Sequence, residues 1–195
     1  MKEILDAIRP HDIYSVLHIG CGTGKELAEI KNEFPNIKIA GCDEDGEKIK
    51  TAQKEFAKKE WGKGWDKHMP SHSGKDYIGR TADTILYRGP KLENIDFKVG
   101  DPLNVPFHGA SFDLVFTTGI LETIGPDNII RVMREIRRVN SRNGKVLFVE
   151  RNSKSVLKRI IAGLRGKHIY DYEQMLNDIF FKNIRINGNI ITATI

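Results

Sequence analysis

The sequence predicts an α/β fold, a doubly wound and mostly parallel sheet with helices on both faces and an antiparallel hairpin at the C-terminal end. Short runs of branched apolar residues alternate along the chain with segments whose apolar residues repeat at helical spacing. That alternation is typical of parallel strands joined by crossover helices. Near the C-terminus, Asn187 and Gly188 separate two branched apolar runs, which is a strong signal for a two-residue hairpin turn.

The expected strands are short and rich in Val, Ile, Leu and Phe, the residues that favour a pleated, half-buried surface. They are SVLHIG (15–20), IKIAGCD (37–43), IDFKV (95–99), FDLVFTT (112–118), GKVLFVE (144–150) and the two halves of FFKNIRINGNIITATI (180–195).

Five segments are expected to be helices because their apolar residues fall on one side of a helical turn. Pro35 ends the second of them, and Pro126 with Asp127 begins the fourth. The apolar stripes are Ile4, Leu5, Ile8; Leu27, Ile30, Phe34; Ile49, Ala52, Phe56; Ile129, Ile130, Met133, Ile136; and Val156, Leu157, Ile160, Ile161, Leu164.

Length and composition indicate one globular domain over residues 1–195, since 195 residues suit one domain better than two. No apolar run reaches the roughly 20 residues that cross a bilayer, and the N-terminus lacks the apolar core of a signal peptide. The two cysteines, Cys21 and Cys42, are expected to be packed thiols, with a redox pair as the alternative. These features favour a cytoplasmic protein, and no metal site is expected.

One segment interrupts the alternation of strands and helices. Residues 61–92 mix two tryptophans, five glycines, two prolines and two histidines, with a single short strand-like patch. Long connections of this kind are uncommon and often form binding loops. This insertion is therefore either a surface excursion or a loop over a binding crevice.

Positive charge gathers in the second half of the chain. The formal net charge is +5, and residues 131–167 hold twelve Lys or Arg against two acids, Glu135 and Glu150. Such a face is either simply solvated or a surface for the phosphates of nucleic acid or lipid headgroups. Charge does not decide between these interpretations.

Three glycines follow the first expected strand, at positions 20, 22 and 24 of the run GCGTG. Glycine permits a positive φ and lets a ligand approach the backbone, and the next helix directs its free N–H groups to the same place. The dinucleotide fingerprint needs glycine at position 25, which is Lys25. The phosphate-binding P-loop needs Gly at position 19 and Ser or Thr at position 26, which are Ile19 and Glu26. The pattern that fits is G-x-G-x-G.

Four stretches occur together and in order: VLHIGCGTG (16–24), IAGCDED (39–45), VGDPLNVPFHGASFDLVF (99–116) and GKVLFVE (144–150). With them, residues 13–195 resemble the class I S-adenosylmethionine-dependent methyltransferases. The resemblance implies a Rossmann-like methyltransferase fold with a seven-stranded sheet and a terminal hairpin. It also implies S-adenosylmethionine as cofactor, and it does not specify a substrate.

The resemblance gives each stretch a role. The glycine turn would wrap the methionine end of the cofactor, Asp43 would accept hydrogen bonds from the ribose hydroxyls, and Asp101 would accept one from the adenine amine. Alternatively, Asp43 caps the next helix and Asp101, beside Pro102, is a turn residue. The expected cofactor-binding residues are His18, Gly20, Cys21, Gly22, Gly24, Asp43, Glu44, Asp101, Pro102, Thr117 and Thr118.

Three of these residues need comment. Thr117 and Thr118 end the fourth strand and are expected to face the same crevice, or else to be ordinary strand-end polar residues. His18 stands where the family usually has Asp or Glu, and a neutral imidazole brings no negative charge. Losing a charge-assisted hydrogen bond costs roughly 1–3 kcal/mol, so His18 raises the alternative of a relative that has kept the fold and lost turnover.

Catalytic groups are harder to predict, because methyl transfer from a sulfonium depends mainly on positioning and needs a base only for some acceptors. The [DNS]-P-P-[YFW] signature of amino-methylating enzymes is absent after the fourth strand. Glu122 and Glu150 are the candidate catalytic acids near the crevice. Glu122 could instead belong to a helix start, and Glu150 could pair with Arg151.

The predicted function is S-adenosylmethionine-dependent methyl transfer to a small-molecule acceptor whose identity the sequence does not indicate. One alternative is an RNA-directed methyltransferase or RNA-binding protein that uses the basic residues 131–167. Another is a catalytically inactive partner protein with this fold. Aminopropyl transfer is a more distant option. The sequence does not indicate an oligomeric state.

Overall fold

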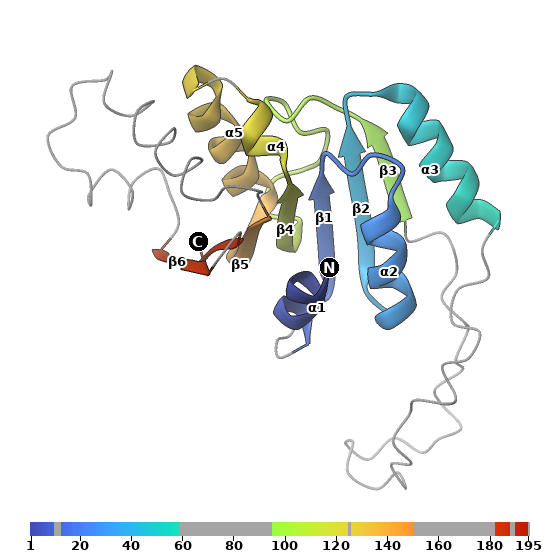
Figure 1. The fold of residues 1–195 in the computed structure, drawn as a ribbon, viewed down its shortest axis with the longest axis horizontal. Helices are drawn as coiled ribbons and strands as arrows, with labels where there is room; N and C mark the ends of the chain where they lie inside the picture. The colour runs from blue at the N-terminus through green and yellow to red at the C-terminus, as the bar shows by residue number, and fades with distance from the viewer. Residues whose placement is uncertain (10–12, 59–94, 125, 150–181, 188–189, 195) are drawn as a thin grey trace, which may run out of the picture.

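The structure is a computed structural model that describes residues 1–9, 13–58, 95–124, 126–149, 182–187 and 190–194. Within these residues the chain forms a seven-stranded sheet in the order β3-β2-β1-β4-β5-β7-β6 (Figure 1). The strands are β1 (Ser15–Ile19), β2 (Lys38–Asp43), β3 (Ile95–Val99), β4 (Phe112–Thr118), β5 (Asn140–Val149), β6 (Lys182–Asn187) and β7 (Ile190–Thr194).

The sheet is mostly parallel, as the alternation of elements predicts. β1 pairs in parallel with β2 and β4, β2 with β3, and β4 with β5. The order of strands reverses between β1 and β4, so this edge is the place where open α/β sheets bind ligands. β7 pairs antiparallel with both β5 and β6. The sequence predicts the hairpin turn at Asn187 and Gly188, which is wrong for Asn187, because Asn187 ends β6 and pairs with Ile190. Residues 188–189 lie outside the described residues.

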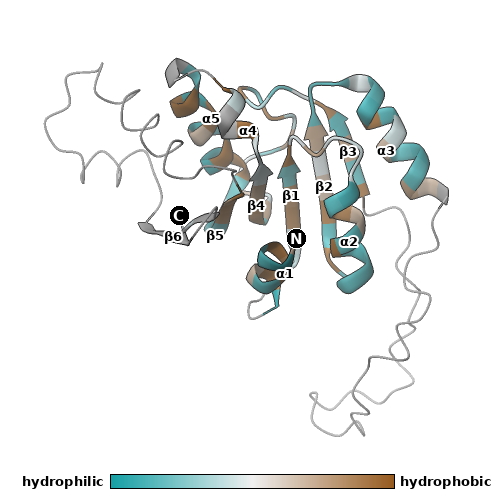
Figure 2. Cartoon of the chain, viewed as in Figure 1, coloured by the Kyte–Doolittle hydropathy of each residue, from teal (hydrophilic) through white to brown (hydrophobic). Residues whose placement is uncertain are grey.

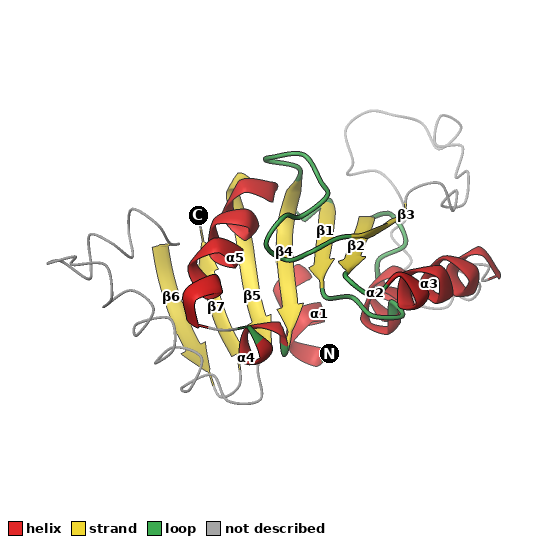
Figure 3. Cartoon of the chain, turned by 90° about the horizontal axis from the view of Figure 1, so that it is seen from above, coloured by secondary structure: helices red, strands yellow, loops and turns green. Residues whose placement is uncertain are grey.

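Helices cover both faces of the sheet (Figure 3). The described helices are α1 (Lys2–Ile8), α2 (Lys25–Glu33), α3 (Gly46–Lys58), α4 (Ile120–Thr123) and α5 (Pro126–Val139). One core cluster joins α5 to the side chains of Leu17 and Ile19 on β1. A second cluster joins α1, α2 and α3 to Val16 on β1 and Leu114 on β4. Successive side chains of a strand point to opposite faces, which explains why β1 contributes to both clusters.

Burial follows the predicted stripes. Ile4 and Ile8 of α1 and Ile136 of α5 are at most 2% exposed, and Figure 2 shows apolar colour along β1 with polar colour on the outer surface of α3. The short N-terminal helix is therefore confirmed as an amphipathic element. No helix among the described residues has the length and apolar character that a membrane crossing requires.

Two elements differ from the sequence-based expectation. β5 begins at Asn140, four residues before the expected start, because Asn140 pairs with Phe112 across an irregular register and its side-chain amide donates to Lys145 O at 2.9 Å. α4 was not expected, since a four-residue helix holds too few turns to produce a periodic pattern. The insertion at 61–92, the helix expected at 155–164 and residues 150–167 of the basic segment lie outside the described residues.

Candidate functional site

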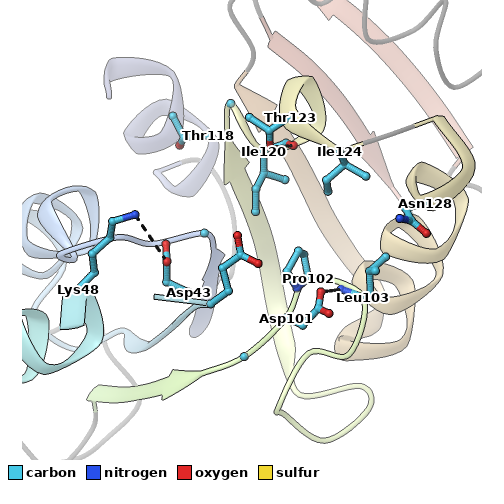
Figure 4. A pocket seen from close by; sticks show the side chains of 14 residues that line it. Asp43, Lys48, Asp101, Pro102, Leu103, Thr118, Ile120, Thr123, Ile124 and Asn128 are labelled. Carbon is cyan, nitrogen blue, oxygen red and sulfur yellow. Dashed lines mark hydrogen bonds and ion pairs between the residues drawn. The ribbon is translucent and has the colours of Figure 1, made fainter. Parts of the chain in front are cut away.

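A cavity of about 550 Å³ opens at the carboxyl ends of β1, β2 and β4, where the strand order reverses (Figure 4). It has a polar end, where Asp43 and Lys48 lie, and an apolar end, where Ile124 and Asn128 lie. Ligand pockets in proteins commonly enclose about 300–1,000 Å³. The lining residues are Gly20, Asp43, Glu44, Lys48, Gly100, Asp101, Pro102, Leu103, Thr118, Gly119, Ile120, Thr123, Ile124 and Asn128.

Asp43 ends β2 with a side chain that backbone donors hold in place. Its Oδ2 accepts a hydrogen bond from Gly22 N at 2.9 Å, and its Oδ1 accepts one from Asp45 N at 3.0 Å. Lys48 Nζ lies 4.0 Å from the same Oδ1 (Figure 4). A carboxylate has about four acceptor positions. Asp43 therefore keeps acceptor capacity toward the cavity while its orientation is fixed.

Asp101 is the second residue of the loop that follows β3 (residues 100–111). Its Oδ1 accepts from Leu103 N at 2.7 Å, and its carbonyl accepts from Asn104 N at 2.9 Å. These bonds make a tight turn that fixes the direction of an otherwise exposed carboxylate (Figure 4). At the near end of the loop, Gly100 N donates to Asp43 O at 3.0 Å. The two predicted carboxylates are therefore connected through the backbone.

The glycine turn after β1 is held by backbone bonds to β2. Gly20 N and Cys21 N both donate to Cys42 O, at 2.7 and 3.0 Å. Gly20, Gly22 and Gly24 all have positive φ, between 54° and 77°. A methyl group placed on Gly22 would meet no atom within 4 Å, whereas one on Gly24 would lie 2.9 Å from the Phe56 ring. Gly22 thus leaves open backbone beside Asp43, and Gly24 is needed for packing.

The apolar end of the cavity comes from the loop after β3 and from α4 and α5. Leu103, Ile120 and Ile124 line it and pack against the α5 core cluster. Thr123 donates its hydroxyl to Ile120 O at 2.8 Å, so its oxygen remains an acceptor. Asn128, in the first turn of α5, adds an amide. Apart from Asp101, whose carboxylate accepts from Leu103 N at its border, no charged side chain lines this end among the described residues (Figure 4).

Six of the predicted cofactor-binding residues line the cavity: Gly20, Asp43, Glu44, Asp101, Pro102 and Thr118. Thr117 does not. It is fully buried, whereas Thr118, at the exposed end of β4, is among the lining residues. The expectation that both threonines face the crevice is wrong for Thr117.

His18 and Cys21 are also covered. The His18 side chain is 1% exposed and stacks on Phe116, with ring centroids 4.1 Å apart. Burial raises the pKa values of the Cys21 and Cys42 thiols, that of Cys42 to about 12. Both thiols are free, which matches the expectation of packed cysteines. None of these three side chains lines the described cavity.

The two candidate catalytic acids stay predictions. Glu122 lies in α4, next to the lining residues Ile120 and Thr123, but its side chain is outside the described residues. Glu150 follows β5 and is outside them entirely. Eight lining residues come from helices and turns and were not among the predicted site residues. One of them, Gly119, lies at a strand-to-helix junction, where glycine is a recognisable turn signal. The others are Lys48, Gly100, Leu103, Ile120, Thr123, Ile124 and Asn128.

Residues 17–148, which include both carboxylates and the glycine turn, match the family described as Methyltransferase domain. The chain belongs to this family. The resemblance to class I S-adenosylmethionine-dependent methyltransferases is therefore confirmed, and S-adenosylmethionine is the cofactor of the class.

Individual methyltransferases are similar to this one at low identity. The demethylmenaquinone methyltransferase of Thermotoga maritima is 24% identical over 149 residues, which cover 76% of this chain and 48% of that protein. The chain thus spans about half the length of this curated relative.

Solved methyltransferases share the fold. A SAM-dependent methyltransferase from Aquifex aeolicus superposes with a TM-score of 0.59 at 13% identity, covering 100% of this chain and 88% of that one. Phosphoethanolamine N-methyltransferase 2 of Haemonchus contortus, solved with S-adenosyl-L-methionine, gives a TM-score of 0.57 at 18% identity over 94% of this chain and 37% of that one.

The residues of this methyltransferase domain fit the cofactor. Asp43 retains acceptor capacity for two vicinal hydroxyls, because each of its oxygens accepts one backbone bond. The backbone at Gly22 is open where a side chain would fill the space. Asp101 is exposed to the cavity with its direction fixed by Leu103 N. These observations match a ligand with a diol, an amine and a chain that rests on bare peptide.

Proposed function

We propose that this protein transfers a methyl group from S-adenosylmethionine to a small, largely apolar and uncharged acceptor. The observation that carries the proposal is the division of one cavity into a carboxylate end and an apolar end. The first end suits a nucleoside cofactor and the second suits an acceptor without formal charge. When bound, S-adenosylmethionine supplies the sulfonium methyl that the reaction transfers.

In this proposal the polar end binds the cofactor. Asp43 accepts hydrogen bonds from the ribose hydroxyls, and Asp101 accepts one from the exocyclic amine of adenine. Gly20 and Gly22 let the methionine end lie on the backbone, while Glu44, Pro102 and Thr118 complete the wall. Each role is supported by the lining position or the hydrogen bonds of the residue, and by the general preference of carboxylates for such donors.

At the other end, the acceptor lies against α4 and the first turn of α5. Ile120 and Ile124 supply apolar contact, and Thr123 and Asn128 supply neutral hydrogen-bonding groups. The name of the Thermotoga relative specifies a quinone-type substrate for that protein, and an acceptor of comparable polarity is compatible with this end. Glu122 stays the candidate base for an acceptor that must lose a proton.

RNA is the weaker candidate substrate. The described part of the basic segment includes Arg138, whose guanidinium is committed to bonds within the domain. Arg131, Arg134 and Arg142 are exposed, and they are the residues of the described part through which phosphate binding would have to act. The other alternative is a catalytically inactive partner protein. It is suggested by His18, which stands where the family usually has Asp or Glu. We also propose that residues 1–195 form one domain, closed by an antiparallel hairpin at its C-terminal end.

Calorimetric titration with S-adenosylhomocysteine tests the cofactor site before an acceptor is known. We expect saturable binding to the wild type and, for Asp43→Asn, a loss of at least about tenfold, because the variant loses a charge-assisted bond. Glu47→Gln is the control, since Glu47 lies nearby on α3 and pairs with Lys50 on the surface. No binding by the wild type at millimolar ligand would contradict the proposal and favour an inactive partner.

A further inference from the structure

We propose that Glu135 and Arg138 of α5 are positioning residues for the cofactor site, because they hold the β3–β4 loop (residues 100–111) that presents Asp101. The inference rests on the proposed function, since it assigns Asp101 to the adenine amine. Neither residue lines the cavity. Their effect on binding would act through the backbone of the loop.

Arg138 donates to two carbonyls of the loop. Its Nη1 donates to Phe107 O and its Nη2 donates to Val105 O, both at 2.8 Å. Glu135 completes the set, because its Oε2 accepts from Val105 N at 2.9 Å. The backbone of Arg138 takes part as well, accepting from Ala110 N at 2.8 Å. One turn of α5 therefore satisfies four backbone groups of a loop that has no strand or helix of its own.

The two side chains also fix each other. Arg138 Nε lies 2.9 Å from Glu135 Oε1, and Arg138 Nη2 lies 2.8 Å from Glu135 Oε2. This paired geometry orients both planar groups. The Glu135 side chain is 18% exposed and that of Arg138 40%, so the ion pair alone would contribute little to stability. Its consequence is orientation of the groups that bond the loop.

The backbone groups that Glu135 and Arg138 bond at Val105 are close to Asp101 in the sequence. Asp101 and Asn104 form a bridge, so residues 101–104 are one compact turn that ends at Val105. On its other side, Gly100 N is bonded to Asp43 O. The Asp101 turn is thus held between β2, which carries Asp43, and α5, which carries the Glu135–Arg138 pair, called the clamp below. The separation of the two carboxylates depends on both attachments.

A second contact on the loop does not replace this clamp. Lys98 Nζ lies 3.4 Å from Pro106 O and 4.5 Å from the centroid of the Phe107 ring. Those contacts hold the middle of the loop to β3, the strand that precedes it. Apolar packing of Val105, Leu103 and Phe107 also holds the loop to α5. Glu135 and Arg138 add the directional bonds that fix how the backbone of the loop is oriented there.

The test compares two ligands that differ at one group. S-adenosylhomocysteine carries the 6-amino group that Asp101 would accept from, and S-inosylhomocysteine carries an oxygen there. We expect the wild type to prefer the amino ligand. Arg138→Lys keeps the charge without the planar fork, and Glu135→Gln keeps the shape without the charge. Each variant should lower the preference by about fivefold or more, since hydrogen bonds to charged groups depend on placement.

Arg134→Lys is the matched control, because Arg134 is exposed on the same helix, one turn away, and forms no ion pair or hydrogen bond with the part of the chain that the structure describes. It should leave the preference unchanged. In an Asp101→Asn background, the clamp substitutions should change the preference little further, since a positioning effect needs the group that it positions.

Three outcomes distinguish the proposed function from the positioning role of Glu135 and Arg138. If the wild type binds neither ligand, the proposed function fails and this inference fails with it. If the wild type prefers the amino ligand and the clamp variants keep that preference while losing thermal stability, the pair is structural and the inference is overturned. The inference is supported if the clamp variants lose the preference for the amino ligand when Asp101 is present. In the Asp101→Asn background, the same substitutions should then cause no further loss.

Discussion

At the scale of single residues, His18 is the least expected feature of the domain. His18 lies on β1 between β2 and β4, in register with Gly41 and Phe116. Neither ring nitrogen has a hydrogen-bond partner in the part of the chain that the structure describes. Burial without partners disfavours the charged form, which lowers the pKa of His18 to about 3. His18 is therefore a neutral core residue that stacks on Phe116.

This burial predicts acid sensitivity. The pKa of His18 is near 6.5 in the unfolded chain and about 3 in the folded one. The unfolded state binds the extra proton, so stability is retained above pH 6.5 and lost as pH falls toward 3. In urea unfolding at several pH values, His18 should contribute up to about 1.4 kcal/mol of loss per pH unit in that window.

His18→Leu should remove that contribution and flatten the acid limb of the unfolding free energy. His108→Gln serves as the control, because His108 is exposed in the β3–β4 loop. Other titrating groups are common to all three proteins, so the difference between them isolates His18. Parallel acid limbs in wild type and His18→Leu would show that the imidazole is accessible to protons in the folded protein.

At the scale of elements, the turn between β1 and α2 combines two glycines with different tasks. Gly24 is the N-cap of α2 with φ of 77°, and a methyl group there would lie 2.9 Å from Phe56 and 3.1 Å from Phe97. Gly24→Ala should cost about 2–4 kcal/mol of unfolding free energy, from the left-handed backbone and the overpacked rings. Gly22→Ala meets open space and should cost about 1 kcal/mol.

For cofactor affinity the two variants should rank the other way, with a larger loss in Gly22→Ala than in Gly24→Ala. A methyl group on Gly22 occupies backbone that the proposed ligand rests on, so Gly22→Ala should weaken S-adenosylhomocysteine binding more than its small effect on stability suggests. Urea unfolding and calorimetric titration of both variants check the pair of predictions. Equal stability costs, or unchanged affinity in Gly22→Ala, would contradict the division of tasks.

The elements that the sequence predicts well are those whose pattern extends over several residues. α5 occupies residues 126–139 as expected, because its apolar stripe is long and a proline marks its start. α4 has one turn and no such pattern. The early start of β5 at Asn140 also escapes prediction, since it depends on pairing with Phe112 in another strand. Tertiary pairing, which a local pattern does not contain, sets these boundaries.

At the scale of the whole molecule, the same distinction applies to the candidate site. Gly20, Asp43, Asp101 and Thr118 could be predicted because they end or closely follow strands, and parallel topology brings strand ends to one edge. Lys48, Ile124 and Asn128 come from helices that lie over that edge. How far a helix reaches over a sheet depends on core packing, and the sequence alone does not specify it. The Glu135–Arg138 clamp escaped prediction for the same reason.

The topology also predicts how the whole chain unfolds. The last strands complete the sheet that the first strands begin, since β7 pairs with β5 and β5 pairs with β4. The ligand cavity lies at the edge of that shared sheet. Unfolding should therefore be cooperative across the chain, and a ligand bound at the edge should stabilise all of it. Scanning calorimetry should show one transition rather than two.

S-adenosylhomocysteine at a hundred times its Kd should raise the unfolding free energy by about 2.7 kcal/mol. For a domain of this size, about 2–4 °C of Tm accompanies each kcal/mol, so the transition should move up by about 5–11 °C. At the same ligand concentration, Asp43→Asn should move much less, because more of the protein remains unliganded. Two transitions, with one of them insensitive to the ligand, would show instead that residues 1–195 contain separately folding units.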